Sequence, residues 1–157
     1  ISINNLEKNI KVVPIPLTNK ENIFQEMNEG HFTEGGALNS FGEKFGPEGK
    51  EFKPTMKYSL LGTTMNYFIE NSILDIPDYI KIDVDGFEHK VIDGAKKMLK
   101  NKKVKSVIIE LNPHLPEHLS IVEILQNLGF NFSQEQVDKA ARKEDPFKGM
   151  SEYIFRR

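Results

Sequence analysis

Alternating apolar and polar residues at 79–84 predict a short β-strand, bounded by Pro77 and Gly86. The pattern changes to helical spacing directly afterwards. Apolar residues recur at three- and four-residue intervals over 87–100, which predicts a helix with one apolar face. The two elements form a strand, a turn and a helix that can pack on a sheet.

A second apolar run, at 104–111, is nearly continuous, which is typical of an interior parallel strand covered on both faces. Helices are also predicted from Thr63 or Thr64, as the capping residue, to about Glu70, and over 120–128. Weaker strand patterns lie at 11–17, 57–61, 131–136 and 152–155. Strands and helices alternate, so we expect a single α/β domain over 1–157 with a mostly parallel sheet.

Two regions depart from this regular pattern. The expected strand at 11–17 contains Pro14 and Pro16, which lack N–H groups on the same lateral side, so it belongs at a sheet edge. Residues 18–55 are rich in glycine and phenylalanine and have weak periodicity. We expect a variable insertion there, with a hairpin and a lid-like loop.

The composition narrows the class of protein. Of the 157 residues, 38% are hydrophobic and 28% are charged, as in a soluble globular domain with a real core. The net charge of −2 gives no general attraction to nucleic acid, and no apolar run is long enough for a membrane span. Because the sequence has no cysteine, it has no disulfide and no cysteine-ligated metal, and we expect a protein of the reducing cytoplasm.

Three carboxylates crowd into the turn after the strand at 79–84: Asp83, Asp85 and Glu88. In open α/β sheets the functional crevice lies beyond the carboxyl ends of the strands, so these side chains are candidate site residues. A structural alternative is that Asp85 caps the following helix and Glu88 completes a capping box. Asp83 has no such routine use at the end of an apolar strand, which favours a functional role.

Two motifs suggest other chemistry. His114 and His118 have the H-x-x-E-H spacing of zinc peptidases, but Pro116 is expected to begin a helix between them, which favours a loop-and-cap role. Residues 83–86 have the D-x-D-G pattern of magnesium-dependent phosphatases with an aspartate nucleophile. Phe87 stands where those enzymes have threonine, so a phosphatase is kept as an alternative only.

One segment resembles a known family: IKIDVDGFEHKVIDGAKKML, followed by VKSVIIELN. FkbM-type S-adenosylmethionine-dependent methyltransferases have the signature K-x-D-V-[ED]-G-x-E, then a Gly-Ala pair and a strand ending in Glu. The matching residues are Lys81, Asp83, Val84, Asp85, Gly86, Glu88, Gly94, Ala95 and Glu110. NNLEKNIKVVPIPLTNK, LGTTMNYFIEN and SEYIFRR resemble the family's third strand, its threonine-led helix and its closing strand, with 21–52 the poorest match.

The resemblance implies a Rossmann-like, doubly wound sheet with the strand order 3-2-1-4-5-7-6. The strand at 11–17 would be the third, and the strand before Asp83 the fourth. The family's first two strands, which carry a glycine-rich turn and an acidic residue for the cofactor, would precede Ile1. We therefore expect a partial domain with a gap in its sheet, belonging to a longer protein, completed by another chain, or remaining as a noncatalytic remnant.

The resemblance also implies an activity: methyl transfer from S-adenosylmethionine to a small-molecule, sugar or lipid hydroxyl. By resemblance, Leu17 and Thr18 lie near the adenine of the cofactor. We expect Asp83, Asp85 and Glu88 to form the catalytic site, with Asp83 also near the cofactor, and Lys81, Glu110 and Asn112 to face the methyl acceptor. Asp83 would act as general base if burial and a neighbouring like charge raise its proton affinity, or would contact the cofactor. A noncatalytic binding fragment is the other alternative, and the acceptor, O- or N-methylation and a homo-oligomer stay open.

Overall fold

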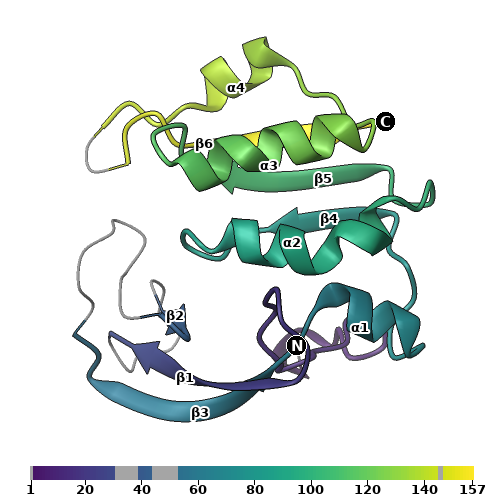
Figure 1. Cartoon of the computed structure of the whole chain (residues 1–157), viewed down its shortest axis with the longest axis vertical. Coiled ribbons are helices and arrows are strands. Elements are labelled where there is room, and N and C mark those ends of the chain that lie inside the picture. Colours follow the sequence, from purple (N-terminus) through teal and green to yellow (C-terminus); the bar gives the residue numbers. More distant parts are fainter. Residues whose placement is uncertain (1, 31–38, 44–52, 145–146) are drawn as a thin grey trace.

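The computed structural model of the chain describes residues 2–30, 39–43, 53–144 and 147–157. These residues form a mixed α/β arrangement with two small three-stranded sheets (Figure 1). The strands are β1 (Ile23–Glu29), β2 (Ser40–Phe41), β3 (Met56–Gly62), β4 (Tyr79–Ile82), β5 (Ser106–Leu111) and β6 (Ser151–Arg156). The helices are η1 (Ser2–Asn4), which is a 3-10 helix, α1 (Met65–Glu70), α2 (Glu88–Leu99), α3 (Pro116–Asn127) and α4 (Gln134–Ala140).

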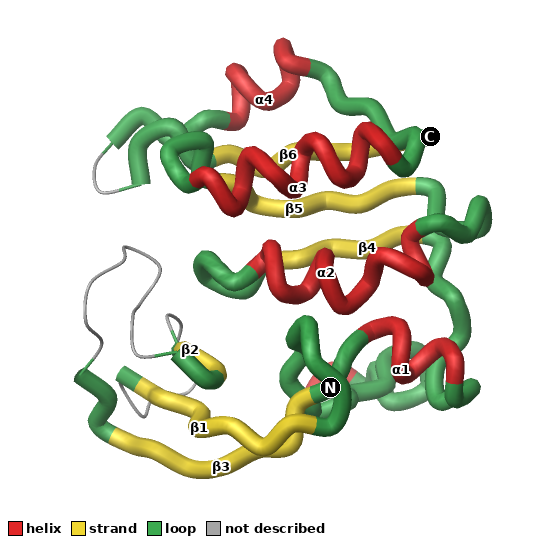
Figure 2. Tube along the Cα trace, viewed as in Figure 1, coloured by secondary structure: helices red, strands yellow, loops and turns green. Residues whose placement is uncertain are grey.

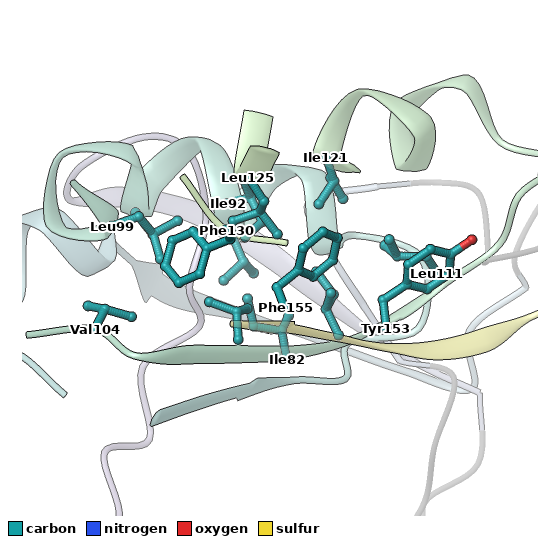
Figure 3. Packing of buried hydrophobic residues seen from close by; sticks show 14 of the residues in the cluster. Ile82, Ile92, Leu99, Val104, Leu111, Ile121, Leu125, Phe130, Tyr153 and Phe155 are labelled. Atoms are coloured by element: carbon teal, nitrogen blue, oxygen red, sulfur yellow. The ribbon is translucent and has the colours of Figure 1, made fainter. Parts of the chain in front are cut away.

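The second sheet carries the hydrophobic core. Its strand order is β4-β5-β6, with β4 parallel and β6 antiparallel to the central β5. Helices α2 and α3 lie side by side on one face of this sheet (Figures 1 and 2). Side chains from that face and from both helices meet between the layers, as Figure 3 shows for Ile82, Ile92, Leu125 and Phe155. Removal of this apolar surface from water is the main force that holds the unit together.

The opposite face of the second sheet has no helix over it in the described part of the chain (Figures 1 and 3). Lys81 and Glu152 are exposed there, and Ile108 is half-buried beside Ile154 of β6. The prediction that 104–111 is covered on both faces was therefore wrong. Ile108, the apolar residue of β5 on that face, lies beside Ile154 of β6 and not beneath a helix.

The first sheet has the strand order β2-β1-β3 and is antiparallel throughout. The strand expected at 57–61 is confirmed as β3, which pairs with β1 along its whole length. With this antiparallel sheet, an antiparallel β6 and helices on one face of the second sheet, the described residues do not form the expected doubly wound, mostly parallel sheet. Most of the expected lid-like loop, at 31–38 and 44–52, lies outside the described residues.

The strand predicted at 11–17 was wrong. Only Leu17 of this segment forms a bridge, and it runs parallel to Thr63. Pro14 and Pro16 explain the failure, because neither has the N–H group that a ladder requires on that side. The segment is held instead at its end, where the N–H of Thr63 donates to the carbonyl of Pro16 at 3.0 Å.

Three helices follow the local signals of the sequence. Helix α2 agrees with the predicted range, with Phe87 at its N-cap. Helix α1 begins after Thr64, whose hydroxyl accepts a hydrogen bond from the N–H of Tyr67 at 2.9 Å. Helix α3 begins at Pro116, as the proline predicts, and so starts four residues earlier than the apolar pattern alone indicated.

The strand predicted at 131–136 was also wrong, because α4 occupies this region. Ser133 caps that helix by accepting a hydrogen bond from the N–H of Gln136 at 3.4 Å. Asn131 retains a single bridge to Arg156 of β6. A good capping residue therefore outweighs a weak alternating pattern at this position.

The two lateral edges of the second sheet differ in how their backbone groups are hydrogen-bonded. Along β6, the side chain of Gln136 donates to the carbonyl of Glu152 at 2.9 Å and accepts from the N–H of Ile154 at 3.3 Å, which protects that edge. Along β4, no strand of the described residues pairs with the outer edge. This open edge lies where the resemblance expects a gap.

Candidate functional site

The turn between β4 and α2 reverses the chain sharply. Asp85 and Gly86 have positive φ angles of 54° and 103°. Helix α2 begins after Phe87, which makes no side-chain capping bond, so the predicted capping box with Asp85 as the cap is wrong. The left-handed backbone at Asp85 explains this, because a capping residue normally has an extended conformation.

Glu88 lies beneath this turn, with only 2% of its surface exposed. Its Oε1 accepts hydrogen bonds from the N–H groups of Val84 and Gly86, at 3.2 and 3.3 Å. Its negative charge also suits the positive N-terminal end of α2. Glu88 thus supports the turn from inside the protein.

The other oxygen of Glu88 faces His118 of α3, which is equally buried. The distance from His118 Nε2 to Glu88 Oε2 is 3.2 Å, although the two groups are not well aligned for a hydrogen bond. The Nδ1 of His118 accepts the N–H of Asn112 at 2.9 Å, which assigns the proton of the neutral ring to Nε2, facing Glu88. Burial raises the pKa of Glu88, but contacts with His118 and backbone N–H groups outweigh it and leave this pKa below its ordinary value of 4.5.

Asp83 lies on the outer side of the turn, where 52% of its side chain is exposed. Its Oδ2 is 3.4 Å from the Nζ of Lys81, which also lies 3.0 Å from Glu152 of β6. Hydrogen bonds and charge attraction to Glu152, and then to Asp83, raise the pKa of Lys81. A cation beside Asp83 is the opposite of the like charge that we expected beside a general base.

Two of the three residues expected on the acceptor side, Glu110 and Asn112, are engaged within the protein. Arg142 donates to the Oε1 of Glu110 at 2.5 Å. The Oδ1 of Asn112 accepts the N–H of His114 at 2.9 Å, and the N–H of Asn112 goes to His118. Neither Glu110 nor Asn112 lines the two cavities described next.

Two cavities lie beside the acidic turn. The first, of about 270 Å³, is lined by Leu17, Thr18 and Asp85 together with apolar and polar neighbours. The second, of about 580 Å³, follows β4 and is lined by Leu17, Lys81 and Asp83 with the apolar face of α2. Leu17 belongs to both, so the cavities adjoin. The structure thereby brings together five of the site residues expected from the sequence, from segments far apart in the chain.

A close backbone approach places Leu17 and Thr18 at these cavities. The N–H of Thr18 donates to the carbonyl of Thr63 at 2.8 Å, which anchors the segment. On its other side lies Gly94 of α2, where a Cβ atom would stand 2.2 Å from the carbonyl oxygen of Thr18. Only glycine permits this contact, so Gly94 sets the distance between the Thr18 segment and α2.

Two further residues at the first cavity were not singled out from the sequence. Lys90 contacts the carboxylate of Glu43, and its Nζ lies 5.5 Å from the centroid of the Phe87 ring. Asn39 also lines this cavity, and its buried Oδ1 has no hydrogen-bond partner among the described residues. Neither residue carries a sequence signal, because helix lysines and loop asparagines are usually solvated.

The role of His118 could have been predicted in part. It stands three and seven residues before Ile121 and Leu125, which are fully buried in α3, and so lies on the apolar side of that helix. A histidine in such a position must find polar partners inside the protein. The identity of the partner, Glu88, is a matter of tertiary packing alone.

The magnesium-phosphatase alternative gains no support from this geometry. Asp83 and Asp85 line different cavities. Among residues 2–30, 39–43, 53–144 and 147–157, no group of three or more His, Asp or Glu side chains could hold a metal ion.

The helices within the same ranges include none that is long and apolar enough to cross a membrane.

Comparison with known proteins gives one finding. Residues 9–132 match the family model described as the methyltransferase FkbM domain. No curated protein and no solved structure matches the chain. The matched range contains Leu17, Thr18, the acidic turn and His118, and it confirms the resemblance drawn from the sequence.

Proposed function

We propose, because this chain belongs to the methyltransferase FkbM domain family, that it takes part in methyl transfer from S-adenosylmethionine to a hydroxyl group of a small molecule, sugar or lipid. The observation that carries the proposal is the convergence of Leu17, Thr18, Asp83 and Asp85 on two adjoining cavities. All four residues lie inside the matched range.

The cavities suit a ligand of the size and polarity of this cofactor. Their volumes, about 270 and 580 Å³, are comparable with the roughly 300–1,000 Å³ of small-molecule sites. The buried Oδ1 of Asn39 could accept a hydrogen bond from a ligand amine. The carboxylates of Asp83 and Asp85 can accept hydrogen bonds from ribose hydroxyls and attract a sulfonium cation.

S-adenosylmethionine, when bound, supplies a methyl group whose bond to sulfur breaks, with the electron pair going to sulfur, as a bond to the acceptor oxygen forms. Asp83 is the proposed group that either accepts the proton of the acceptor hydroxyl or contacts the cofactor. Its exposure would let a proton pass on to solvent. Asp85 and Glu88 complete the proposed catalytic turn, Asp85 at the first cavity and Glu88 beneath the backbone.

Lys81, Glu110 and Asn112 are the proposed contacts of the methyl acceptor. Ile82 of β4 pairs with Ile109 of β5, so Asp83 and Glu110 follow two paired residues at the carboxyl ends of parallel strands. Ligands of α/β sheets commonly bind beyond such strand ends. An acceptor there would lie over both strand ends, beside Lys81.

A Rossmann-like sheet and a cytoplasmic location belong to the same proposal. The order β4-β5-β6 agrees with the 4-5-7 part of the strand order that the resemblance implies. The absence of cysteine from the sequence fits a reducing compartment.

Calorimetric titration of S-adenosylmethionine into the intact protein tests the proposal. We expect saturable binding and, for Asp83→Asn, a fall in turnover of about 100-fold or more, the lower range for loss of general base catalysis. Asp93→Asn is the matched control, because Asp93 lies on α2, pairs with Lys96 and lines neither cavity.

Other outcomes would favour the alternatives. A folded protein that does not bind S-adenosylmethionine would support a noncatalytic fragment. Magnesium-dependent hydrolysis of p-nitrophenyl phosphate that is lost in Asp83→Asn would support a phosphatase. Turnover near the wild-type rate in Asp83→Asn would remove Asp83 from the mechanism.

A further inference from the structure

One histidine connects the segments that follow β4 and β5. His118 lies in the first turn of α3 and is 2% exposed. Its Nδ1 accepts the N–H of Asn112, the residue directly after β5, and its Nε2 faces Glu88, the residue that begins α2. Both ring nitrogens are therefore directed at groups inside the protein.

Glu88 passes this constraint to the backbone of the acidic turn. Its Oε1 accepts the N–H groups of Val84 and Gly86, which flank the left-handed residue Asp85. N–H groups of neighbouring residues in such turns form a small concavity that favours an anion. A buried carboxylate is costly unless donors surround it, so the turn depends on Glu88 and Glu88 depends on a donor from the side of His118.

We infer that His118 is a positioning residue of the acidic turn: through Glu88 it holds the backbone of residues 84–86 and so sets the placement of Asp83 and Asp85. Neither His118 nor Glu88 lines a cavity, so this effect on a ligand is indirect. The consequence for methyl transfer rests on the proposed function. The structural contacts from His118 through Glu88 to the turn are independent of that function.

This role differs from that of a histidine that only fills space. A space-filling side chain could be replaced by leucine without a local effect on the turn. A positioning residue must direct its Nε2–H toward Glu88 and accept the N–H of Asn112 at Nδ1, which requires one particular tautomer. The two roles therefore differ in a spectroscopic property of the wild-type protein.

The first measurement is a long-range ¹H–¹⁵N NMR spectrum of the intact wild-type chain near neutral pH. We expect His118 to be neutral, with its proton on Nε2 and an unprotonated Nδ1. A neutral ring protonated on Nδ1 would overturn the inference, because that nitrogen could not accept the N–H of Asn112. A charged ring would overturn it for the same reason.

The second measurement is amide hydrogen exchange in three variants. In His118→Leu we expect the protection of the Val84 and Gly86 amides to fall at least about tenfold more than that of Val107 in β5. His118→Gln, which can still donate to Glu88, should restore most of that protection. His114→Leu is the matched control. His114 is exposed in the loop between β5 and α3, so its replacement should leave the turn unchanged.

Equal loss of protection at Val84, Gly86 and Val107 in His118→Leu would indicate general destabilisation and overturn the inference. So would unchanged protection of the turn. If His118→Leu does not fold, His118→Gln decides: retained protection of the turn supports the inference, and selective loss overturns it. These readouts need no cofactor, so they stand whether or not S-adenosylmethionine binds. When it does bind, His118→Leu should weaken its affinity and His118→Gln should restore it.

Discussion

The acidic turn has two sides that use carboxylates in opposite ways. On the inner side, Glu88 is buried, its Oε1 accepts two backbone N–H groups, and its Oε2 lies 3.2 Å from His118 Nε2. On the outer side, Asp83 is half-exposed beside Lys81. Three residues of the same acidic cluster thus divide into a buried support, Glu88, and two residues that line the cavities, the exposed Asp83 and the half-buried Asp85.

The difference shows why residue type alone does not assign a role. Glu88 is buried and its Oε1 accepts two N–H groups of the turn, so it cannot engage a ligand without losing its support of the turn. An exposed ion pair such as that of Asp83 with Lys81 contributes little to stability. The inner side therefore accounts for rigidity, and the outer side is where chemistry can occur.

The largest expected effect separates the two sides directly. Glu88→Ala should lower the free energy of unfolding by about 3–5 kcal/mol, because it leaves His118 and two N–H groups without their anion. Asp83→Ala should leave the urea midpoint unchanged. Urea denaturation followed by circular dichroism measures both, and equal losses in the two variants would contradict the division.

A packing change where the Thr18 segment meets α2 should have the next largest effect. Gly94→Ala places a methyl group against the carbonyl of Thr18. We therefore expect the free energy of unfolding to fall by about 1–3 kcal/mol, despite the higher helix propensity of alanine. Lys96→Ala, on the solvent face of the same helix, is the control. An unchanged or raised melting temperature in Gly94→Ala would show that the Thr18 segment can move away without cost.

Acid should lower the free energy of unfolding by protonating Glu88 on the inner side of the turn. The pKa of Glu88 in the folded protein lies below the ordinary 4.5, so its stabilising effect is complete above that value and is lost as the pH falls through the folded pKa. The difference in unfolding free energy between wild type and Glu88→Gln should be constant above pH 4.5 and shrink below it. Urea titrations of both proteins at a series of pH values test this, and a difference that grows on acidification would be the wrong sign.

The smallest effect concerns the outer side. Lys81→Met removes the ammonium group beside Asp83. We expect no change in the free energy of unfolding, because an exposed ion pair contributes little. Binding of the sulfonium cofactor should be about two- to threefold tighter at low salt, because a competing cation is gone. Lys97→Met, which removes a lysine paired with Glu70, is the control. Weaker cofactor binding in Lys81→Met would mean that Lys81 contacts the cofactor itself.

Several elements could be predicted because their signals are local. The helical spacing after Phe87, the threonine before α1 and Pro116 at the start of α3 act within one or two turns of chain, and the structure follows each of them. Predictions based on weak alternation were less secure. The segment at 11–17 failed for lack of backbone donors, and the one at 131–136 gave way to a helix capped by Ser133.

The candidate site likewise has features that the sequence could predict and features that it could not. The family signature identified Asp83, Asp85 and Gly94 from the order of residues, since that order reflects one strand, one turn and one helix. The signature could not show that Glu88 turns inward, because this depends on His118, which lies on another helix. Nor could it show that Thr18 reaches the same cavities, which depends on the close approach to Gly94.

The sequence by itself determined the family, most helix boundaries and the existence of an acidic turn, because these depend on neighbours along the chain. Tertiary structure alone decided which carboxylate is buried, which face of the second sheet is covered and which distant residues share a cavity. Burial and pairing are properties of groups that meet in space, and a carboxylate takes its character from the donors and water around it.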